Sequence, residues 1–240
     1  MDNINNLVKK SEFLEGAKAS LPLIVGAIPF AILFGTLAPN SGLSAIATIA
    51  MSVFVFAGSA QFIVLALLAV QAPLQVILFT TFVVNLRHLL YATALVDYVK
   101  HLPLPLRALL AFGLTDETFA NVSQRYLKKD KTYAHYFYLG SMCCFYVNWV
   151  LFTAIGLLLG NLIPDISNWG LEFAMSVTFI GMLVPYMNSK AMISAVMCAG
   201  LSSLMFAHLP NKLGLIISAI IGIAVGLSIS LFTKNSLSYE

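Results

Sequence analysis

The chain has 240 residues, of which 60% are hydrophobic and 10% are charged, and its mean hydropathy is +0.90. These values lie outside the range of a soluble globular domain. The net charge of +3 says little by its magnitude, and no nucleic-acid partner is expected. The sequence predicts an all-α integral membrane protein with a transmembrane domain over residues 19–233. Residues 1–18 are predicted to form a cytoplasmic N-terminal tail, helical from about Ser11.

Eight apolar segments can be drawn, which predicts seven or eight transmembrane helices, since about 20 apolar residues form one crossing. Segments two and five are longer than a bilayer requires and must tilt, break or extend beyond it. Aromatic residues such as Tyr138, Tyr146 and Trp149 fit a belt at the membrane interface. The segments cover residues 19–38, 44–70, 74–96, 106–124, 133–160, 171–187, 191–208 and 213–232.

Basic residues suggest how the chain is oriented. Lysines precede the first segment, and Arg125 and Lys128 belong to a basic cluster after the fourth. By the positive-inside rule both places are predicted to be cytoplasmic. Counting eight crossings puts Lys100 and Arg107 outside, so a seven-crossing count with one re-entrant segment remains an alternative.

Two stretches of the chain resemble each other. Residues 33–40 are similar to residues 158–165, and the sequence Ala-Met-Ser-Val at 50–53 recurs at 174–177. This pattern indicates an internal repeat of two parallel halves, as in some transporters. Chance similarity between apolar helix ends is the alternative.

The second segment contains a polar interruption. Gly58, Ser59 and Gln61 lie between two strongly apolar runs. A helix broken there would expose backbone N–H and C=O groups near mid-membrane, where they could bind the charged groups of a zwitterion. The alternative is that these small residues let two helices pack closely.

The third segment carries an arginine about halfway along. Arg87 has no other charged residue in its apolar run, and Asn85 and His88 lie beside it. An arginine at this depth is costly unless it faces protein, water or a counter-ion, so it is a candidate functional residue. The alternative is a structural ion pair for Arg87 and a satisfied buried imidazole for His88.

Two adjacent carboxylates, Asp116 and Glu117, lie in the fourth segment. On a helix they point about 100° apart, so one could pair with Arg87 while the other meets water, substrate or a proton. Solvation of both near the cytoplasmic end is the alternative. Cys143, Cys144 and Cys198 have no spacing that indicates a disulfide framework or a metal site. No cofactor and no metal are expected.

Several of these motifs together resemble the AzlC family, the large subunit of bacterial branched-chain amino acid exporters. The most specific are Gly-Ser-Ala-Gln-Phe at residues 58–62 and Asn-Leu-Arg-His at residues 85–88, in this order. Leu-Thr-Asp-Glu at 114–117 and Leu-Glu-Phe-Ala at 171–174 also fit the pattern. The resemblance covers most of the chain.

The resemblance implies efflux of leucine, isoleucine, valine and also methionine through the bacterial cytoplasmic (inner) membrane. It also implies a small membrane subunit of the AzlD type as partner. It provides no set of binding residues, so these are hypotheses from the residues themselves. The predicted substrate-binding residues are Gly58, Ser59, Gln61, Asn85 and Arg87, and the predicted proton-coupling or ion-pair residues are His88, Asp116 and Glu117.

An enzyme is not expected, but a rival hypothesis is an intramembrane serine hydrolase. In that hypothesis Ser59 would be activated by His88 or His208. No carboxylate is evidently placed to orient the base, and the longer motifs stay unexplained. A passive channel is a third alternative.

Overall fold

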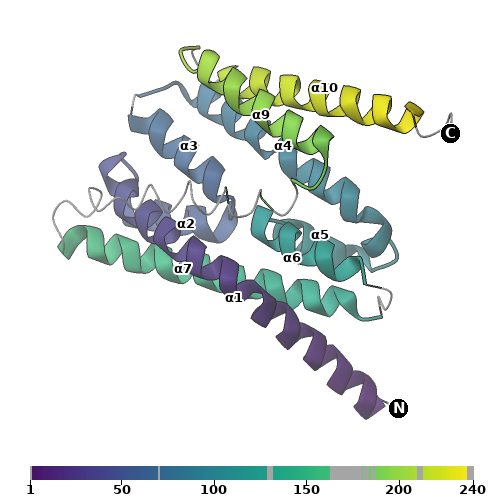
Figure 1. Ribbon diagram of the computed structural model, residues 1–240. Coiled ribbons are helices and arrows are strands. Elements are labelled where there is room, and N and C mark those ends of the chain that lie inside the picture. Colours follow the sequence, from purple (N-terminus) through teal and green to yellow (C-terminus); the bar gives the residue numbers. More distant parts are fainter. Residues whose placement is uncertain are drawn as a thin grey trace. The chain divides into compact units, whose positions relative to one another are not determined.

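The computed structural model describes residues 2–69, 71–128, 132–162, 180, 184, 187–209 and 213–236. The chain divides into two compact units, Met1–Thr178 and Phe179–Glu240. The predicted all-α class is confirmed for the described residues, which contain helices joined by turns (Figure 1). The first unit contains α1 (Asp2–Asn40), α2 (Ala45–Phe54), α3 (Gly58–Ala69), α4 (Leu74–Val99), α5 (Leu104–Phe112), α6 (Asp116–Tyr126) and α7 (Ala134–Leu162), and the second contains α9 (Lys190–Met205) and α10 (Leu213–Ser236).

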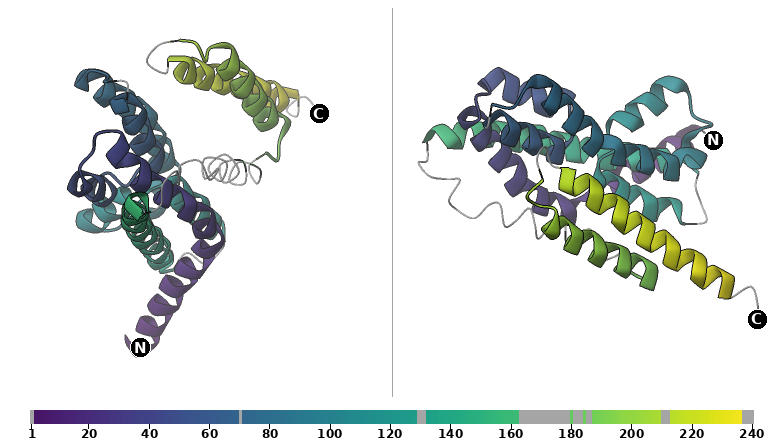
Figure 2. Two further views of the ribbon diagram at one scale, coloured as in Figure 1. Left: turned by 90° about the vertical axis from the view of Figure 1, so that its left-hand side faces the viewer. Right: turned by 90° about the horizontal axis from the view of Figure 1, so that it is seen from above.

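The long helices α1 and α7 lie alongside each other (Figures 1 and 2). Glycines on each helix lie against the backbone of the other, so close that an added methyl group would overlap it. Such glycines allow two helices to approach closely in a membrane. Residues near the start of α1 contact residues near the start of α7, and later residues of α1 contact later residues of α7, so the two helices are parallel. The pairs are Gly16 with Phe137, Gly140 with Phe13, and Gly156 with Ile32.

Helix α1 begins earlier than predicted. It is continuous from Asp2 through the expected tail and includes Pro22, Pro29 and Pro39. The parallel packing against α7 begins as early as Phe13. Tertiary contact thus extends the helix into residues whose composition alone does not require it.

The fourth apolar segment is a helical hairpin rather than one continuous helix. Helix α5 runs in the same direction as α7. The Leu110 carbonyl accepts a hydrogen bond from Tyr138, and the later Phe112 packs against Tyr146, which is further along α7. Helix α6 runs in the opposite direction. Asn121 donates to Ser20 of α1, and the later Arg125 pairs with the earlier Glu12.

Helix α4 runs in the same direction as α6 and opposite to α7. Tyr91 stacks on Phe119 near the beginning of α6, and Tyr98 stacks on Tyr126 at its end. Helix α3 is antiparallel to α4, because Ser59 contacts Arg87 while the end of α3 is joined to the start of α4 by a short turn. Helix α3 therefore runs in the same direction as α7.

The second apolar segment is also a hairpin. Ser52 of α2 is hydrogen-bonded to Thr153 of α7, whereas Val53, one residue later, accepts a hydrogen bond from Tyr146, seven residues earlier on α7. Helix α2 is therefore antiparallel to α7 and to α3. The predicted interruption is confirmed, but the break lies at residues 55–57 and α3 begins at Gly58.

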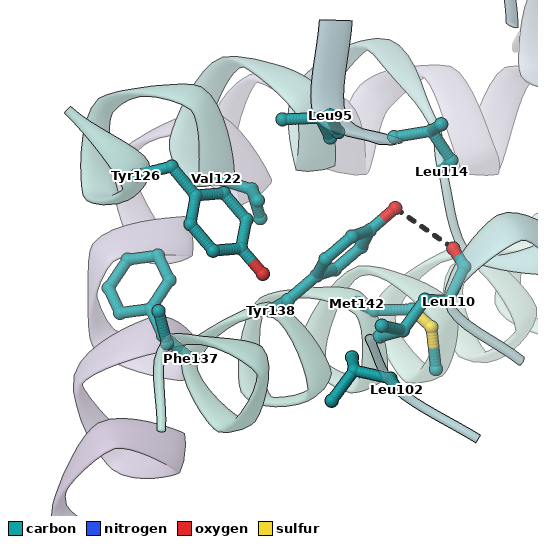
Figure 3. Packing of buried hydrophobic residues seen from close by; sticks show 10 residues of the cluster. Leu95, Leu102, Leu110, Leu114, Val122, Tyr126, Phe137, Tyr138 and Met142 are labelled. Atoms are coloured by element: carbon teal, nitrogen blue, oxygen red, sulfur yellow. Dashed lines mark hydrogen bonds between the residues drawn. The ribbon is translucent and has the colours of Figure 1, made fainter. Parts of the chain in front are cut away.

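The two hairpins meet at their tips. Phe56 in the first tip lies 6.0 Å from Phe112 beside the second, measured between ring centroids, and Tyr146 packs edge-on against both rings. Helix α7 also satisfies carbonyl groups that lack a helical partner where α2 and α5 stop. Tyr146 donates to the Val53 carbonyl at 3.1 Å, and Tyr138 donates to the Leu110 carbonyl at 2.9 Å (Figure 3).

The hairpins change the predicted pattern of crossings. The sequence predicts five crossings before residue 162, but only α1, α4 and α7 are long and apolar enough to cross a membrane alone among the described residues. Segments two and four have the length of a crossing, yet each turns back at its centre. The sixth predicted segment lies largely outside the described residues.

The second unit is a pair of antiparallel helices in its described part. Gly222 lies against Ala199 and Ala195, and Gly226 lies against Ala195 and Ala191. Small residues spaced four apart on both helices form a close helix–helix contact.

Candidate functional site

Arg87 joins the tips of the two hairpins. It lies close to the middle of α4, and its Nη1 is 2.8 Å from Oδ2 of Asp116 at the start of α6. Its Nη2 donates a hydrogen bond to Oγ of Ser59 at the start of α3. The side chains of Arg87 and Asp116 are 25% and 15% exposed. The structure thus brings together three predicted site residues that lie far apart in the sequence.

Asp116 has partners on both carboxylate oxygens. Its Oδ1 accepts a hydrogen bond of 2.6 Å from the Tyr91 hydroxyl, while Oδ2 faces Arg87. The Tyr91 ring is in turn stacked on Phe119, with 4.5 Å between centroids. These contacts fix the orientation of the carboxylate and make the ion pair a rigid feature of the site.

Both hairpins direct a helix N-terminus toward Arg87. Helix α3 begins at Gly58 and α6 begins at Asp116, each directly after a tip. The N-terminal end of a helix carries a partial positive charge and free N–H groups that favour anions. Thr115 caps α6 by accepting a hydrogen bond from the Thr118 amide. The centre of the unit therefore combines one guanidinium and two helix N-termini with the carboxylate of Asp116.

Gln61 and Gly58 lie on the side of the first hairpin that faces α7. The fully buried Gln61 accepts a hydrogen bond from Trp149 Nε1 at 3.0 Å and donates to Ser52 Oγ at 3.3 Å. Ser52 is also bonded to Thr153. Gly58 lies next to the Trp149 ring. This network fixes the position of the first tip, and Ser59 is the residue of this motif that contacts Arg87.

Asn85 and His88 lie on the same helix as Arg87 but are not bonded to it. His88 Nδ1 is 3.0 Å from the Asn85 backbone oxygen, and the imidazole lies edge-on to Tyr91. Within the described chain, Oδ1 of Asn85 and Nε of Arg87 are buried without a hydrogen-bond partner. One hydrogen-bond acceptor and one donor of the predicted site are therefore available to bind a ligand.

Glu117 directly follows Asp116 in the first turn of α6, about 100° further round the helix. It lies one turn before Asn121 on α6, so the two side chains share a face. Asn121 bonds to Ser20 of α1 and Ser141 of α7, which places Glu117 on the side of α6 that faces these two helices. The two adjacent carboxylates therefore lie on different faces of α6, and the role of Glu117 stays a prediction.

The sequence interpretation missed the second break and the tyrosines that stabilise both tips. Gly113 interrupts the segment, and Thr115 followed by two acidic residues is a typical helix start. These signals are enough to predict the break in retrospect. The sequence predicts an interface belt for Tyr138 and Tyr146, but their hydroxyl groups donate hydrogen bonds to backbone carbonyls near the hairpin tips. No group of three metal-ligating side chains occurs among the described residues.

Comparison with known proteins identifies the family. The model of the AzlC protein family matches residues 22–163, more than half of the chain. The chain belongs to the AzlC family. The match includes α2 to α6, and therefore both hairpin tips and Arg87.

Three known proteins are similar in sequence to this AzlC-family chain. Inner membrane protein YgaZ of Escherichia coli is 33% identical over 150 residues, which cover 62% of this chain and 61% of that protein. An uncharacterized membrane protein of Archaeoglobus fulgidus is 34% identical over 223 residues, which cover 91% of this chain and 96% of that protein. Branched-chain amino acid transport protein AzlC of Bacillus subtilis is 30% identical over 194 residues, which cover 76% of this chain and 71% of that protein.

Two of these names describe membrane proteins, in agreement with the apolar helices α1, α4 and α7. No solved structure matches the AzlC-family chain.

Proposed function

We propose that this AzlC-family protein is a secondary transporter that exports leucine, isoleucine, valine and also methionine across the bacterial cytoplasmic membrane. The Bacillus subtilis relative is named as a branched-chain amino acid transport protein. The observation that carries the proposal is the Arg87–Asp116 pair between two hairpin tips. A zwitterionic amino acid has the same two charges in one small molecule.

In the proposed mechanism the substrate replaces this ion pair with its own charges. Its carboxylate binds Arg87 and the N-terminus of α3 at Gly58 and Ser59, and its ammonium group binds Asp116. Because each charge of the resting pair exchanges one partner for another, binding leaves no buried charge unpaired. Asn85 lies two residues before Arg87, so its side chain belongs to another face of α4, and its buried Oδ1 is a further acceptor outside this exchange.

The surroundings of the tips suit an apolar side chain. Phe56, Phe112 and Tyr146 form an aromatic group where the hairpins meet. Aliphatic side chains pack well against such rings, and ligand sites in proteins combine apolar walls with few polar anchors. Polar amino acids would lose hydration there without a new partner.

The arrangement supports a membrane orientation with three crossings and two re-entrant hairpins in the first unit. Apart from Arg87, the described basic residues before residue 162 lie toward the end where α1 and α7 begin. This distribution fits a cytoplasmic N-terminus. Eight crossings would put Lys100 and Arg107 outside, whereas this orientation puts both in the cytoplasm. The hairpin α5–α6 would enter from the cytoplasm and α2–α3 from outside.

Proton coupling is part of the proposal, with Glu117 as carrier. In this mechanism Asp116 exchanges Arg87 for the substrate ammonium group and stays paired as a carboxylate throughout, and His88 faces a backbone carbonyl of its own helix. Glu117 instead shares a face with Asn121, which bonds to Ser20 and Ser141. A Glu117→Gln variant is then expected to bind leucine but to lose flux driven by a pH gradient.

We further propose a small membrane subunit of the AzlD type as partner. Helix α4 exposes much of its apolar surface, including Phe79, Phe82 and Leu89. Lipid alone would cover these apolar side chains, but helices of a second subunit packed on this helix would also shield the partly exposed Arg87 from lipid.

The hydrolase alternative is less well supported. Ser59 Oγ accepts a hydrogen bond from Arg87, and His88 is held by Asn85. A nucleophilic serine requires a base within hydrogen-bond reach, whereas an arginine donor makes the hydroxyl less nucleophilic. A Ser59→Ala variant that keeps full export would exclude a hydrolase that depends on this serine.

The decisive experiment measures leucine flux in proteoliposomes that contain the protein and its small subunit. Export against a gradient is expected for the wild type and a loss of at least tenfold for Arg87→Ala. Arg107→Ala, which removes an exposed arginine of α5, is the matched control and should retain flux. Wild-type flux by Arg87→Ala would contradict the proposed site, and flux that never exceeds equilibration would indicate a channel.

A further inference from the structure

A cavity of about 330 Å³ lies between α1, α6 and α7, away from Arg87. It is at the end of the unit where α1 and α7 begin and where α6 ends. Lys18 and Glu15 line it from α1, Gln124 lines it from α6, and Lys128 lines it from just beyond the end of α6. The buried Phe137 contributes an apolar wall.

Arg125 also borders the cavity, but its charge is already compensated. It donates to both carboxylate oxygens of Glu12, from Nε at 3.0 Å and from Nη2 at 2.6 Å. Both side chains are largely buried, with exposures of 5% and 14%. The bidentate pair forms a rigid floor, so the remaining charges are two exposed lysines and Glu15. The cavity therefore has a net positive charge.

An apolar stripe continues from the cavity along α1. Lys18, Leu21 and Val25 are three and four residues apart and share one helix face. Leu21 is 53% exposed and Val25 is 69% exposed. A ligand that occupies both regions must have an anionic head and an apolar tail.

We propose that this cavity binds the headgroup of an anionic glycerophospholipid. The phosphate lies between Lys18 and Lys128, headgroup hydroxyls bond to Gln124 and Glu15, and the acyl chains follow Leu21 and Val25. Basic pockets between membrane helices bind such headgroups through charge-assisted hydrogen bonds. A free phosphate ion would make no contact with the apolar stripe, whereas lipid acyl chains would, which favours the lipid as occupant. The site does not depend on the proposed transport function.

The test uses purified full-length protein in a neutral detergent and native mass spectrometry. Wild-type protein is expected to retain dioleoyl-phosphatidylglycerol about tenfold more strongly than dioleoyl-phosphatidylcholine. The variant Lys18→Ala/Lys128→Ala should lose this preference. Lys10→Ala/Lys100→Ala removes the same charge elsewhere and should keep it. Circular dichroism checks that the variants are folded.

Two results would overturn the site, and a third would overturn the identity of its occupant. One is equal retention of both lipids by the wild type, which needs no variant. The other is an equal loss of preference in both double variants, because this would indicate attraction by net charge alone. If inorganic phosphate at millimolar concentration displaces phosphatidylglycerol and alone gives the same thermal protection, the occupant is free phosphate and the lipid assignment is wrong.

Discussion

At the residue scale, the central question is how an arginine is tolerated in the middle of an apolar helix. Arg87 donates to Ser59 and pairs with Asp116, and Asp116 is itself fixed by Tyr91. A charge at mid-membrane is costly when it is unpaired. Each contact therefore lowers the free-energy cost of placing the guanidinium in an apolar helix. The same contacts hold the two hairpin tips in place.

The structural and substrate-binding roles of Arg87 can be separated by a double-mutant cycle. Asp116→Asn leaves Arg87 without its counter-charge and should destabilise the protein by about 1–3 kcal/mol, since the pair is partly exposed. Arg87→Gln/Asp116→Asn removes both charges and should recover most of this loss. Thermal unfolding in detergent provides the measurement.

The same double variant should still fail to transport leucine, because it lacks both groups that bind the zwitterion. Recovery of flux together with recovery of stability would make the pair purely structural. The proposed mechanism would then need another site.

Gly58 allows a second residue-scale prediction. A methyl group added there would lie 2.8 Å from the Trp149 ring, which is fixed by its hydrogen bond to Gln61. Gly58→Ala should therefore lower the free energy of unfolding by about 1–3 kcal/mol. Gly200 in α9 has open space around its added methyl group. Gly200→Ala should be neutral or stabilising by about 1 kcal/mol, so equal destabilisation in both variants would contradict the packing argument.

At the element scale, hydropathy predicts where apolar segments lie but not which way the chain leaves them. Segments two and four have the length of a crossing, and a break at the centre of each leaves two half-helices that can continue or turn back. The choice depends on contacts from α7, a distant part of the chain. The break near Gly58 and the pairing of Arg87 with one of two carboxylates were predictable, because both follow from local residue types.

The contacts of α7 lead to a third prediction. Tyr138→Phe removes the hydroxyl that binds the Leu110 carbonyl and leaves this buried acceptor unsatisfied, at a cost of about 1–3 kcal/mol. Tyr146→Phe should have a similar effect on the Val53 carbonyl. Tyr136→Phe is the control, since its less buried ring packs against His135 and Tyr133. The midpoint of thermal unfolding should fall for the first two variants and stay within error for the control.

At the scale of the whole molecule, α1 and α7 are related in sequence and in packing. Each has a phenylalanine followed three residues later by a glycine, and each glycine lies against the other helix's phenylalanine. This reciprocal, parallel contact is expected if the two helices begin equivalent halves, and it supports the repeat inferred from residues 33–40 and 158–165. The later part of that repeat lies outside the described residues.

The hairpins also make a prediction about membrane topology that differs from a count of eight crossings. With both hairpins re-entrant, Ala72 lies outside and Lys100 lies in the cytoplasm. With continuous crossings both positions are reversed. Asn40 is outside and Lys128 is cytoplasmic in either case, so these two positions serve as controls.

Single cysteines at the four positions, in a variant whose three native cysteines are replaced by serine, would be labelled in intact cells with a membrane-impermeant maleimide. We expect labelling at positions 40 and 72 and protection at 100 and 128 until the membrane is permeabilised. The charge distribution favours this outcome, because it leaves Lys100 and Arg107 on the same side as Lys9 and Lys128. Labelling at 100 with protection at 72 would show that the chain crosses the membrane at both breaks, and the tips could not then enter from opposite faces.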